Sequence, residues 1–140
     1  MSAPPPGPND APRSRAARTV LVPGLIAGVA AAIANSIVYA IASAAGASLS
    51  ASFGSGAIEV LPFMPAVASF FPLAIAAVVA WLIVRAAPGA RRPLAWIGFA
   101  VGIVSALIPL LAADGVDSAL GLAAMHVIAG VAWVVAIGRR

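Results

Sequence analysis

Few side chains inside the long apolar runs can form hydrogen bonds, and four of them are candidate site residues: Asn35, Tyr39, Ser105 and His126. At about 1.5 Å per helical residue, Asn35, Ser105 and His126 fall about 8, 13 and 12 Å below one face of a bilayer core about 30 Å thick, and Ser69 falls at about 6 Å. Tyr39 comes one turn after Asn35, on the same helix face. Since ionisable residues inside membranes are functional candidates by default, these four residues predict a small pocket in that half of the membrane.

The same residues have a plainer interpretation. Asn35 and His126 can hydrogen-bond across helices as packing contacts, worth roughly 0.6–2 kcal/mol each. Asp114 also has two interpretations, as a rim residue of the pocket or as a hydrated group beside the start of the last apolar run. There Asp117 or Ser118 is expected as the N-cap, because a negative charge is favoured at that end of a helix dipole.

Several kinds of chemistry are excluded by residue type. The chain has no Cys, which rules out thiolate metal sites and disulfide exchange. His126 is the one histidine and lacks a second ligand at its depth, so we predict neither a metal nor a cofactor. Ser105 and His126 form the one conceivable nucleophile and base pair, but no G-x-S-x-G, H-E-x-x-H or phosphate-loop motif accompanies them. We therefore expect no enzyme.

Composition places the chain in a membrane. Of its 140 residues 63% are hydrophobic and 9% charged, whereas soluble domains are about 25% charged. The mean hydropathy is +1.09. All eight basic residues are arginines that flank apolar runs, so the net charge of +4 indicates membrane topology and not binding to nucleic acid. Lipid is the expected solvent.

The apolar runs predict an all-α membrane protein, an antiparallel four-helix transmembrane bundle. Residues 1–18 are rich in Pro and Arg and predict a disordered cytoplasmic tail, and residues 19–140 form the transmembrane domain. A cleaved signal peptide is an alternative for the first run, although this run is longer than the 7–15 residues typical of one. The four spans are expected at about residues 20–45, 65–84, 94–113 and 118–138, each close to the roughly 20 residues that a helix needs.

Charge predicts the orientation of the bundle. The tail, the loop at 85–92 and the C-terminus carry every arginine, whereas the connections at 46–64 and 113–117 carry three acids and no basic residue. The positive-inside rule then predicts a multi-pass plasma-membrane protein with both termini in the cytoplasm. The three tryptophans are expected at the cytoplasmic interface; they are Trp81, Trp96 and Trp133.

Small residues at four-residue spacing predict close helix packing. They are Gly24, Gly28, Ala32 and Ser36 in the first span and Gly98, Gly102 and Ala106 in the third. Packing within one chain and a homodimer seam are both open. Kinks are expected at Pro72 and Pro109. The connection at 46–64 alternates in polarity, which fits either a short extracellular β-hairpin or a flexible loop.

Particular positions also carry a family resemblance. They are Gly24, Asn35 and Tyr39, a Pro-containing loop, and then Asp114, Leu120-Gly121-Leu122 and Met125-His126. With them, the chain over about residues 19–138 resembles a family of small four-span membrane proteins that is frequent in actinobacteria and classed as a domain of unknown function. The resemblance implies a four-helix membrane bundle and no activity.

Three functions remain open. The first is a non-enzymatic accessory protein that interacts with a protein partner, with itself as a homo-oligomer, or with lipid of the bilayer. The second is a binder or carrier of a small apolar molecule in the pocket around Asn35 and His126. The third is an enzyme working from the outer face. Transport by a single chain is disfavoured because the inner half of each span lacks polar side chains.

Overall fold

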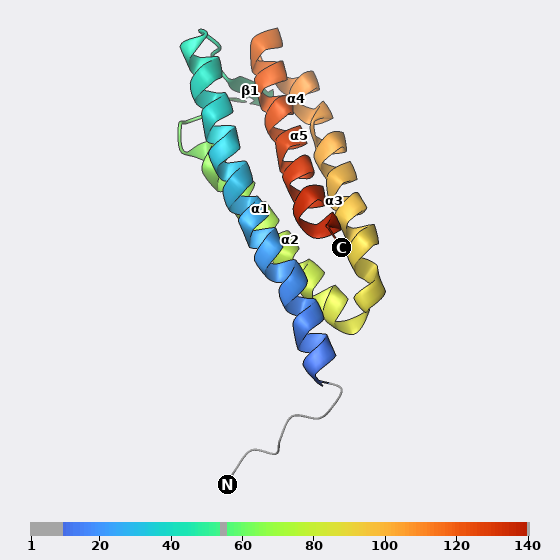
Figure 1. Cartoon of the computed structure of the whole chain (residues 1–140). Helices are drawn as coiled ribbons and strands as arrows, with labels where there is room; N and C mark the ends of the chain where they lie inside the picture. The colour runs from blue at the N-terminus through green and yellow to red at the C-terminus, as the bar shows by residue number, and fades with distance from the viewer. Residues whose placement is uncertain (1–9, 54–55, 140) are drawn as a thin grey trace.

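The computed structural model describes residues 10–53 and 56–139 of the chain. In order, its elements are α1 (Asp10–Ala44), β1 (Ser50–Phe53), β2 (Gly56–Glu59), α2 (Met64–Ala86), the 3-10 turn η1 (Pro88–Ala90), α3 (Arg91–Ser105), α4 (Leu107–Ala112) and α5 (Val116–Gly138). Four stretches within the described residues are long and apolar enough to cross a membrane: Arg18–Ala44, Met64–Ala86, Pro88–Ala112 and Val116–Gly138. They run alternately up and down (Figure 1), which confirms the predicted antiparallel four-helix bundle.

The first helix begins earlier than the sequence suggests. α1 starts at Asp10, so residues 10–18, predicted as part of a disordered tail, are helical. Ala and Arg dominate this stretch and are strong helix formers, and Pro12 falls in the first turn, where proline is tolerated. Residues 1–9, the rest of that predicted tail, lie outside the described residues.

The third span is interrupted near its end. α3 ends at Ser105 and α4 begins at Leu107. Pro109 has no N–H to donate to the carbonyl of Ser105, which explains the break that the sequence predicts there. The second span is assigned as one helix through Pro72. Pro109 therefore interrupts the third span, whereas the second span continues as one helix past Pro72.

Tight packing holds the arginine end of the bundle, which we define by Arg85, Arg91, Arg92 and Arg139. All four spans contribute to a buried core there: Val20 from α1, Ala77, Ala80 and Val84 from α2, Ala95 from α3, and Trp133 and Ile137 from α5. The Trp133 side chain is 3% exposed, so its predicted place at the membrane interface is wrong. Its indole Nε1 donates to the carbonyl oxygen of Leu94 at 3.0 Å, which satisfies the polar atom inside the bundle.

The glycines of the small-residue ridges lie at helix crossings within the chain. A Cβ placed on Gly24 would meet the Ala77 Cβ at 2.5 Å, and one placed on Gly28 would meet Phe70 at 3.3 Å. On α3, a Cβ on Gly98 would collide with the Trp133 indole. At Gly102 the added atom would meet the backbone of α5, because a Cβ placed there would lie 2.7 Å from the Gly130 Cα.

Ala32 differs from these glycines. Its side chain is half-buried and lines a shallow groove between α1 and α2 together with Ile33, Ser36, Ile37, Ala40 and Ala66. The carbonyl oxygen of Ala32 accepts a hydrogen bond from the Ser36 hydroxyl at 2.9 Å. The small-residue ridge of α1 is therefore a tight crossing at Gly24 and Gly28 and a shallow surface groove at Ala32.

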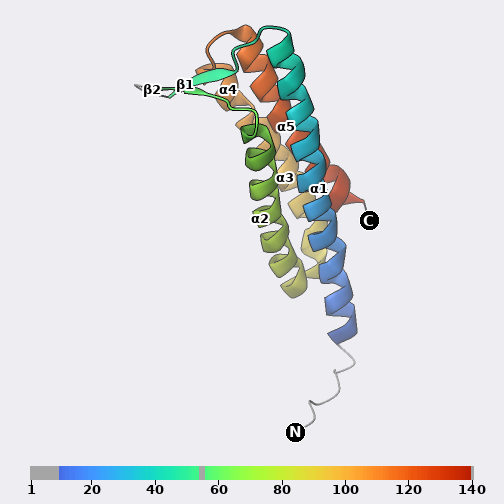
Figure 2. The same ribbon diagram turned by 90° about the vertical axis from the view of Figure 1, so that its left-hand side faces the viewer.

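The helices are paired unevenly. α1 packs along α2 and along α5, and α3 packs along α5, whereas α2 barely contacts α3 although the two are consecutive in the chain. The spans thus follow the spatial order α2, α1, α5, α3, with α2 and α3 as the two outer members (Figures 1 and 2). Away from the shared core at the arginine end, α2 and α3 leave an opening between them.

A β-hairpin covers the opposite end, which we call the hairpin end (Figure 2). β1 and β2 are antiparallel, with Ser50 opposite Glu59. The hairpin is tied to the loop before α5, because the Asp114 N–H donates to the Ser50 carbonyl at 3.0 Å and the Ser52 hydroxyl donates to the Asp114 carboxylate at 2.8 Å. The hairpin interpretation of this connection is therefore confirmed.

Helix α5 does not begin as the sequence predicts. Its N-cap is Gly115, at a φ of 101°, and no side chain caps it. Asp117 lies in the first turn, and Ser118 is buried with its hydroxyl 3.4 Å from that of Ser48. The prediction of Asp117 or Ser118 as N-cap is wrong because Gly115 can adopt the left-handed conformation that lets the helix start earlier.

We expect Gly102→Ala to destabilise the bundle by about 1–3 kcal/mol, because the new methyl group would meet the backbone of α5 and force α3 away from it. Gly138→Ala is the matched control, since a Cβ there would make ordinary contacts at 3.8 Å. Reversible unfolding of both variants in mixed detergent micelles measures the difference. Equal stability of the two variants would contradict this account of the α3–α5 crossing.

Candidate functional site

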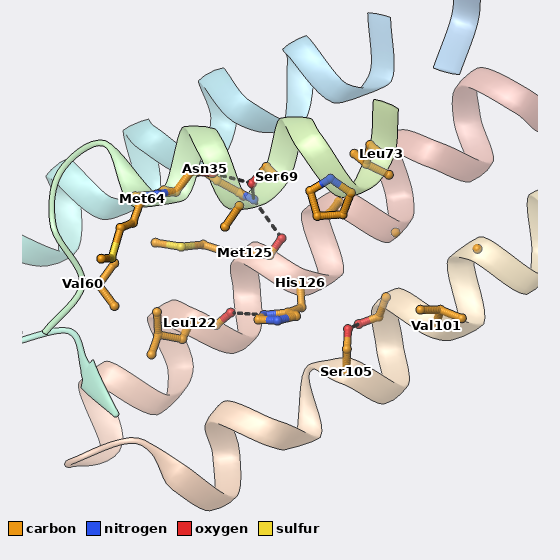
Figure 3. A pocket seen from close by; sticks show the side chains of 17 residues that line it. Asn35, Val60, Met64, Ser69, Leu73, Val101, Ser105, Leu122, Met125 and His126 are labelled. Atoms are coloured by element: carbon orange, nitrogen blue, oxygen red, sulfur yellow. Dashed lines mark hydrogen bonds between the residues drawn. The ribbon is translucent and has the colours of Figure 1, made fainter. Parts of the chain in front are cut away.

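A cavity of about 470 Å³ occupies the opening between α2 and α3 (Figure 3). α5 forms its floor through Leu122, Met125, His126, Ala129 and Gly130, and Val60 and Met64 lie at its hairpin end. The walls are Pro65, Ala68, Ser69, Pro72 and Leu73 from α2 and Gly98, Val101, Gly102 and Ser105 from α3, and Asn35 of α1 completes the lining. Four of these side chains can hydrogen-bond, Asn35, Ser69, Ser105 and His126, and the others are apolar or glycine.

The cavity opens sideways, on the flank of the bundle between α2 and α3. Its edge on α2 includes Ala68 and Pro72, which are exposed, and its edge on α3 includes Val101, whose side chain is 61% exposed. At the arginine end the core around Trp133 closes the bundle.

Asn35 joins three helices at one wall of the cavity. Its side chain is 2% exposed, and Nδ2 donates to the Ser69 hydroxyl at 2.7 Å and to the Met125 carbonyl oxygen at 3.0 Å. Both amide protons are thereby used, which fixes the orientation of the amide. Its Oδ1 is buried with no partner among the described residues. A buried acceptor without a donor costs about 1–3 kcal/mol, so this atom offsets part of what the two Nδ2 bonds contribute.

Ser69 links Asn35 to the first turn of α2 through two hydrogen bonds. Its hydroxyl donates to the Pro65 carbonyl oxygen at 2.6 Å, four residues back, and accepts from Asn35. Pro65 lies in the first turn of α2, where proline is favoured. The chain Asn35, Ser69, Pro65 therefore fixes the hairpin end of α2 against α1 and α5.

His126 faces the cavity from the floor (Figure 3). Its Nδ1 lies 2.8 Å from the carbonyl oxygen of Leu122, one turn back on α5. A carbonyl oxygen has no proton to give, so Nδ1 carries the proton and donates it. In the neutral ring the other nitrogen, Nε2, is then an acceptor, and no partner for it is found in the described part of the chain.

The remaining predicted residues divide into one that lines the cavity and two that do not. Ser105 lines it, and its hydroxyl donates to the Gly102 carbonyl oxygen of its own helix at 3.0 Å. Tyr39 is half-buried on α1 but is not part of the lining. Asp114 is exposed and holds the hairpin through Ser52 instead of standing at the cavity rim. The structure thus brings Asn35, Ser105 and His126 together and leaves Tyr39 and Asp114 outside.

No metal site is formed by the described residues, because nowhere do three His, Asp or Glu side chains gather closely enough to hold an ion. The three acids of the spans' connections, Glu59, Asp114 and Asp117, lie in or beside the loops at the hairpin end. The site is therefore an apolar cavity with a few polar side chains.

Comparison with known proteins adds a family but no activity. Residues 15–140 match the family of unknown function DUF6069. The chain belongs to this family. No curated protein and no solved structure matches it. Together with its four apolar helices, membership in DUF6069 describes a multi-pass membrane protein of unknown activity, and the cavity is what the structure adds.

Neither partner of the Asn35 amide could be identified as its partner from sequence. Ser69 shares the predicted depth of Asn35, yet its bond to Asn35 depends on how α1 and α2 are rotated about their axes, which depth does not give. The Met125 carbonyl oxygen is a backbone group with no signature of its own. The signal that points to both is the isolated Asn35, because a buried amide requires partners at its own depth.

A double-mutant cycle over Asn35 and Ser69 should show a coupling of about 0.6–1.7 kcal/mol in the free energy of unfolding, which runs from the average to the largest value measured for hydrogen bonds between helices of a membrane protein. The cycle combines Asn35→Ala, Ser69→Ala and the double variant in detergent micelles. Asn35→Ala with Ser105→Ala is the control, because these side chains share a cavity but no hydrogen bond. Equal coupling in both cycles would contradict the bond.

Proposed function

We propose that this protein is a non-enzymatic, lipid-interacting membrane protein that holds an apolar chain from the bilayer in the cavity between α2 and α3. The observation that carries the proposal is the lateral opening of a largely apolar cavity whose edges, Ala68, Pro72 and Val101, are exposed to the membrane. A molecule dissolved in the bilayer reaches such a site without crossing water.

The size and chemistry of the cavity support this function. Its volume of about 470 Å³ lies within the roughly 300–1,000 Å³ typical of small-molecule sites. Those sites are mainly apolar with a small number of polar groups that set orientation, and here Asn35, Ser105 and His126 play that part. The affinity comes from apolar contact, and the polar groups select what is bound.

Binding is favoured over catalysis by what the polar groups contact. Ser105 donates to Gly102 and His126 donates to Leu122, so each is engaged by its own helix and neither activates the other. Binding is favoured over conduction by the core around Trp133, which fills the bundle at the arginine end. A protein partner and a homo-oligomer stay predictions.

We further propose a plasma-membrane location with both termini in the cytoplasm. The arginine end carries Arg85, Arg91, Arg92 and Arg139, and the hairpin end carries Glu59, Asp114 and Asp117. This segregation of charge supports the orientation under the positive-inside rule. The cavity would then lie in the outer half of the membrane, beneath the hairpin.

A phospholipid with a diazirine in one acyl chain should photolabel the protein in nanodiscs, and Ala68→Phe should reduce the labelling severalfold, because the added ring occupies the cavity mouth. Ala66→Phe is the matched control. Residues 66 and 68 are about 200° apart around the helix, and Ala66 lines the shallow groove on the α1 side. Mass spectrometry of the crosslinked peptides gives the measurement. Equal labelling of both variants on the cavity-lining peptides would refute the proposal.

A reporter at the C-terminus tests the orientation. We expect a C-terminal green fluorescent protein fusion to be fluorescent and a C-terminal alkaline phosphatase fusion to be inactive, because the first requires the cytoplasm and the second the exterior. Fusions truncated within the connection before α5, at Asp114, should give the opposite pair. Active phosphatase at the C-terminus would overturn the orientation but not the cavity.

A further inference from the structure

The side-chain donors that line the cavity already donate to acceptors within the described chain. Both Nδ2 protons of Asn35 go to Ser69 and Met125, and the hydroxyl protons of Ser69 and Ser105 go to Pro65 and Gly102. The Nδ1 proton of His126 goes to Leu122. Every polar side chain among the described lining residues is thus already engaged as a donor.

The hydrogen-bonding groups without a partner are acceptors. His126 Nε2 has a lone pair and no partner in the described chain. Asn35 Oδ1 also lacks a partner there, but the atom is buried inside the bundle and out of a ligand's reach. The Ala68 carbonyl, on the wall, lacks its usual helical donor because residue 72 is proline. A site that offers acceptors and no donors is matched by a ligand that brings a donor.

The depth of the site limits what that donor can be. His126 lies about 12 Å below the membrane face by helical rise, well inside the hydrocarbon. A charged phospholipid headgroup or an ammonium group would have to leave the interface to reach it, at a cost of several kcal/mol. A neutral hydroxyl carries a donor to this depth at much lower cost.

We infer that the cavity selects a long-chain alcohol, an apolar chain from the bilayer whose neutral hydroxyl donates to His126 Nε2. This inference rests on the proposed function and deepens it by naming the class of ligand. The alkyl chain of the alcohol fills the opening between α2 and α3, and its hydroxyl lies at the floor formed by α5 (Figure 3). The Nδ1 contact with Leu122 fixes the tautomer, and in that tautomer of the neutral ring Nε2 is the acceptor.

The chain supplies its own probes for a test. His126 is the single histidine, so ¹⁵N labelling of histidine gives one pair of ring resonances. Two of the three methionines, Met64 and Met125, line the cavity, so their ¹³C methyl resonances report occupancy. Met64→Leu and Met125→Leu assign these resonances. The full chain in nanodiscs is titrated with 1-dodecanol and with dodecyl methyl ether, which has a chain of equal length and no donor, at equal mole fraction in the bilayer.

Both probes should shift the two methyl resonances, and the alcohol alone should move the Nε2 resonance upfield. The alcohol should also bind roughly two- to tenfold more tightly, as expected for one hydrogen bond. If the alcohol shifts the methyl groups but leaves Nε2 where the ether leaves it, the inference is wrong and the proposed function stands. If neither probe shifts the methyl groups, the proposed function fails as well.

A pair of variants tests the role of the ring nitrogen. His126→Phe should abolish the preference for the alcohol while the methyl shifts with either probe remain. His126→Gln, which restores a side-chain acceptor, should recover part of the preference. A preference that persists in His126→Phe would overturn the inference. If His126→Phe does not fold, the comparison of the two probes on the unmodified chain decides the matter alone.

Discussion

The architecture depends on the close approach of α3 and α5 at Gly102 and Gly130. Lipid provides little hydrophobic drive between helices, so backbone contact at small residues must hold them together. The crossing places α3 on α5, and Trp133 then fills the space beside Gly98 and closes the arginine end. Because α2 is held by α1 and not by α3, the bundle is tight at one end and open along one side at the other. The cavity is a consequence of which helices are paired.

The number and approximate limits of the spans could be predicted from sequence because they depend on one-dimensional quantities. Apolar length gives the spans, and Pro109 gives the break between α3 and α4, since a missing N–H acts at a fixed separation along the chain. The depth of Asn35, Ser105 and His126 follows from helical rise, and the three do line one cavity. These predictions need no knowledge of how the helices are rotated.

What could not be predicted depends on rotation and on competition between local conformations. Tyr39 shares the depth range and the approximate face of Asn35, yet four residues advance a helix by about 400°, and the remaining 40° takes Tyr39 out of the lining. Trp133 is near the end of its span, which suggests the interface, but Gly98 opposite it leaves room for the indole inside the bundle. At α5, Gly115 starts the helix before Asp117 because glycine tolerates a φ of 101°.

The hairpin explains why access to the cavity is lateral. Its contacts with Asp114 hold it across the hairpin end, and beneath it the Leu49 side chain is 1% exposed and packs toward Gly121. Leu49 adopts a φ of 43°, which is costly for a residue with a branched side chain and persists where surrounding contacts impose it. A chain segment held in this way closes the hairpin end of the bundle and leaves no entrance there. With Val60 and Met64 at the hairpin end of the cavity and the core around Trp133 at the arginine end, the route left to His126 on α5 runs between α2 and α3.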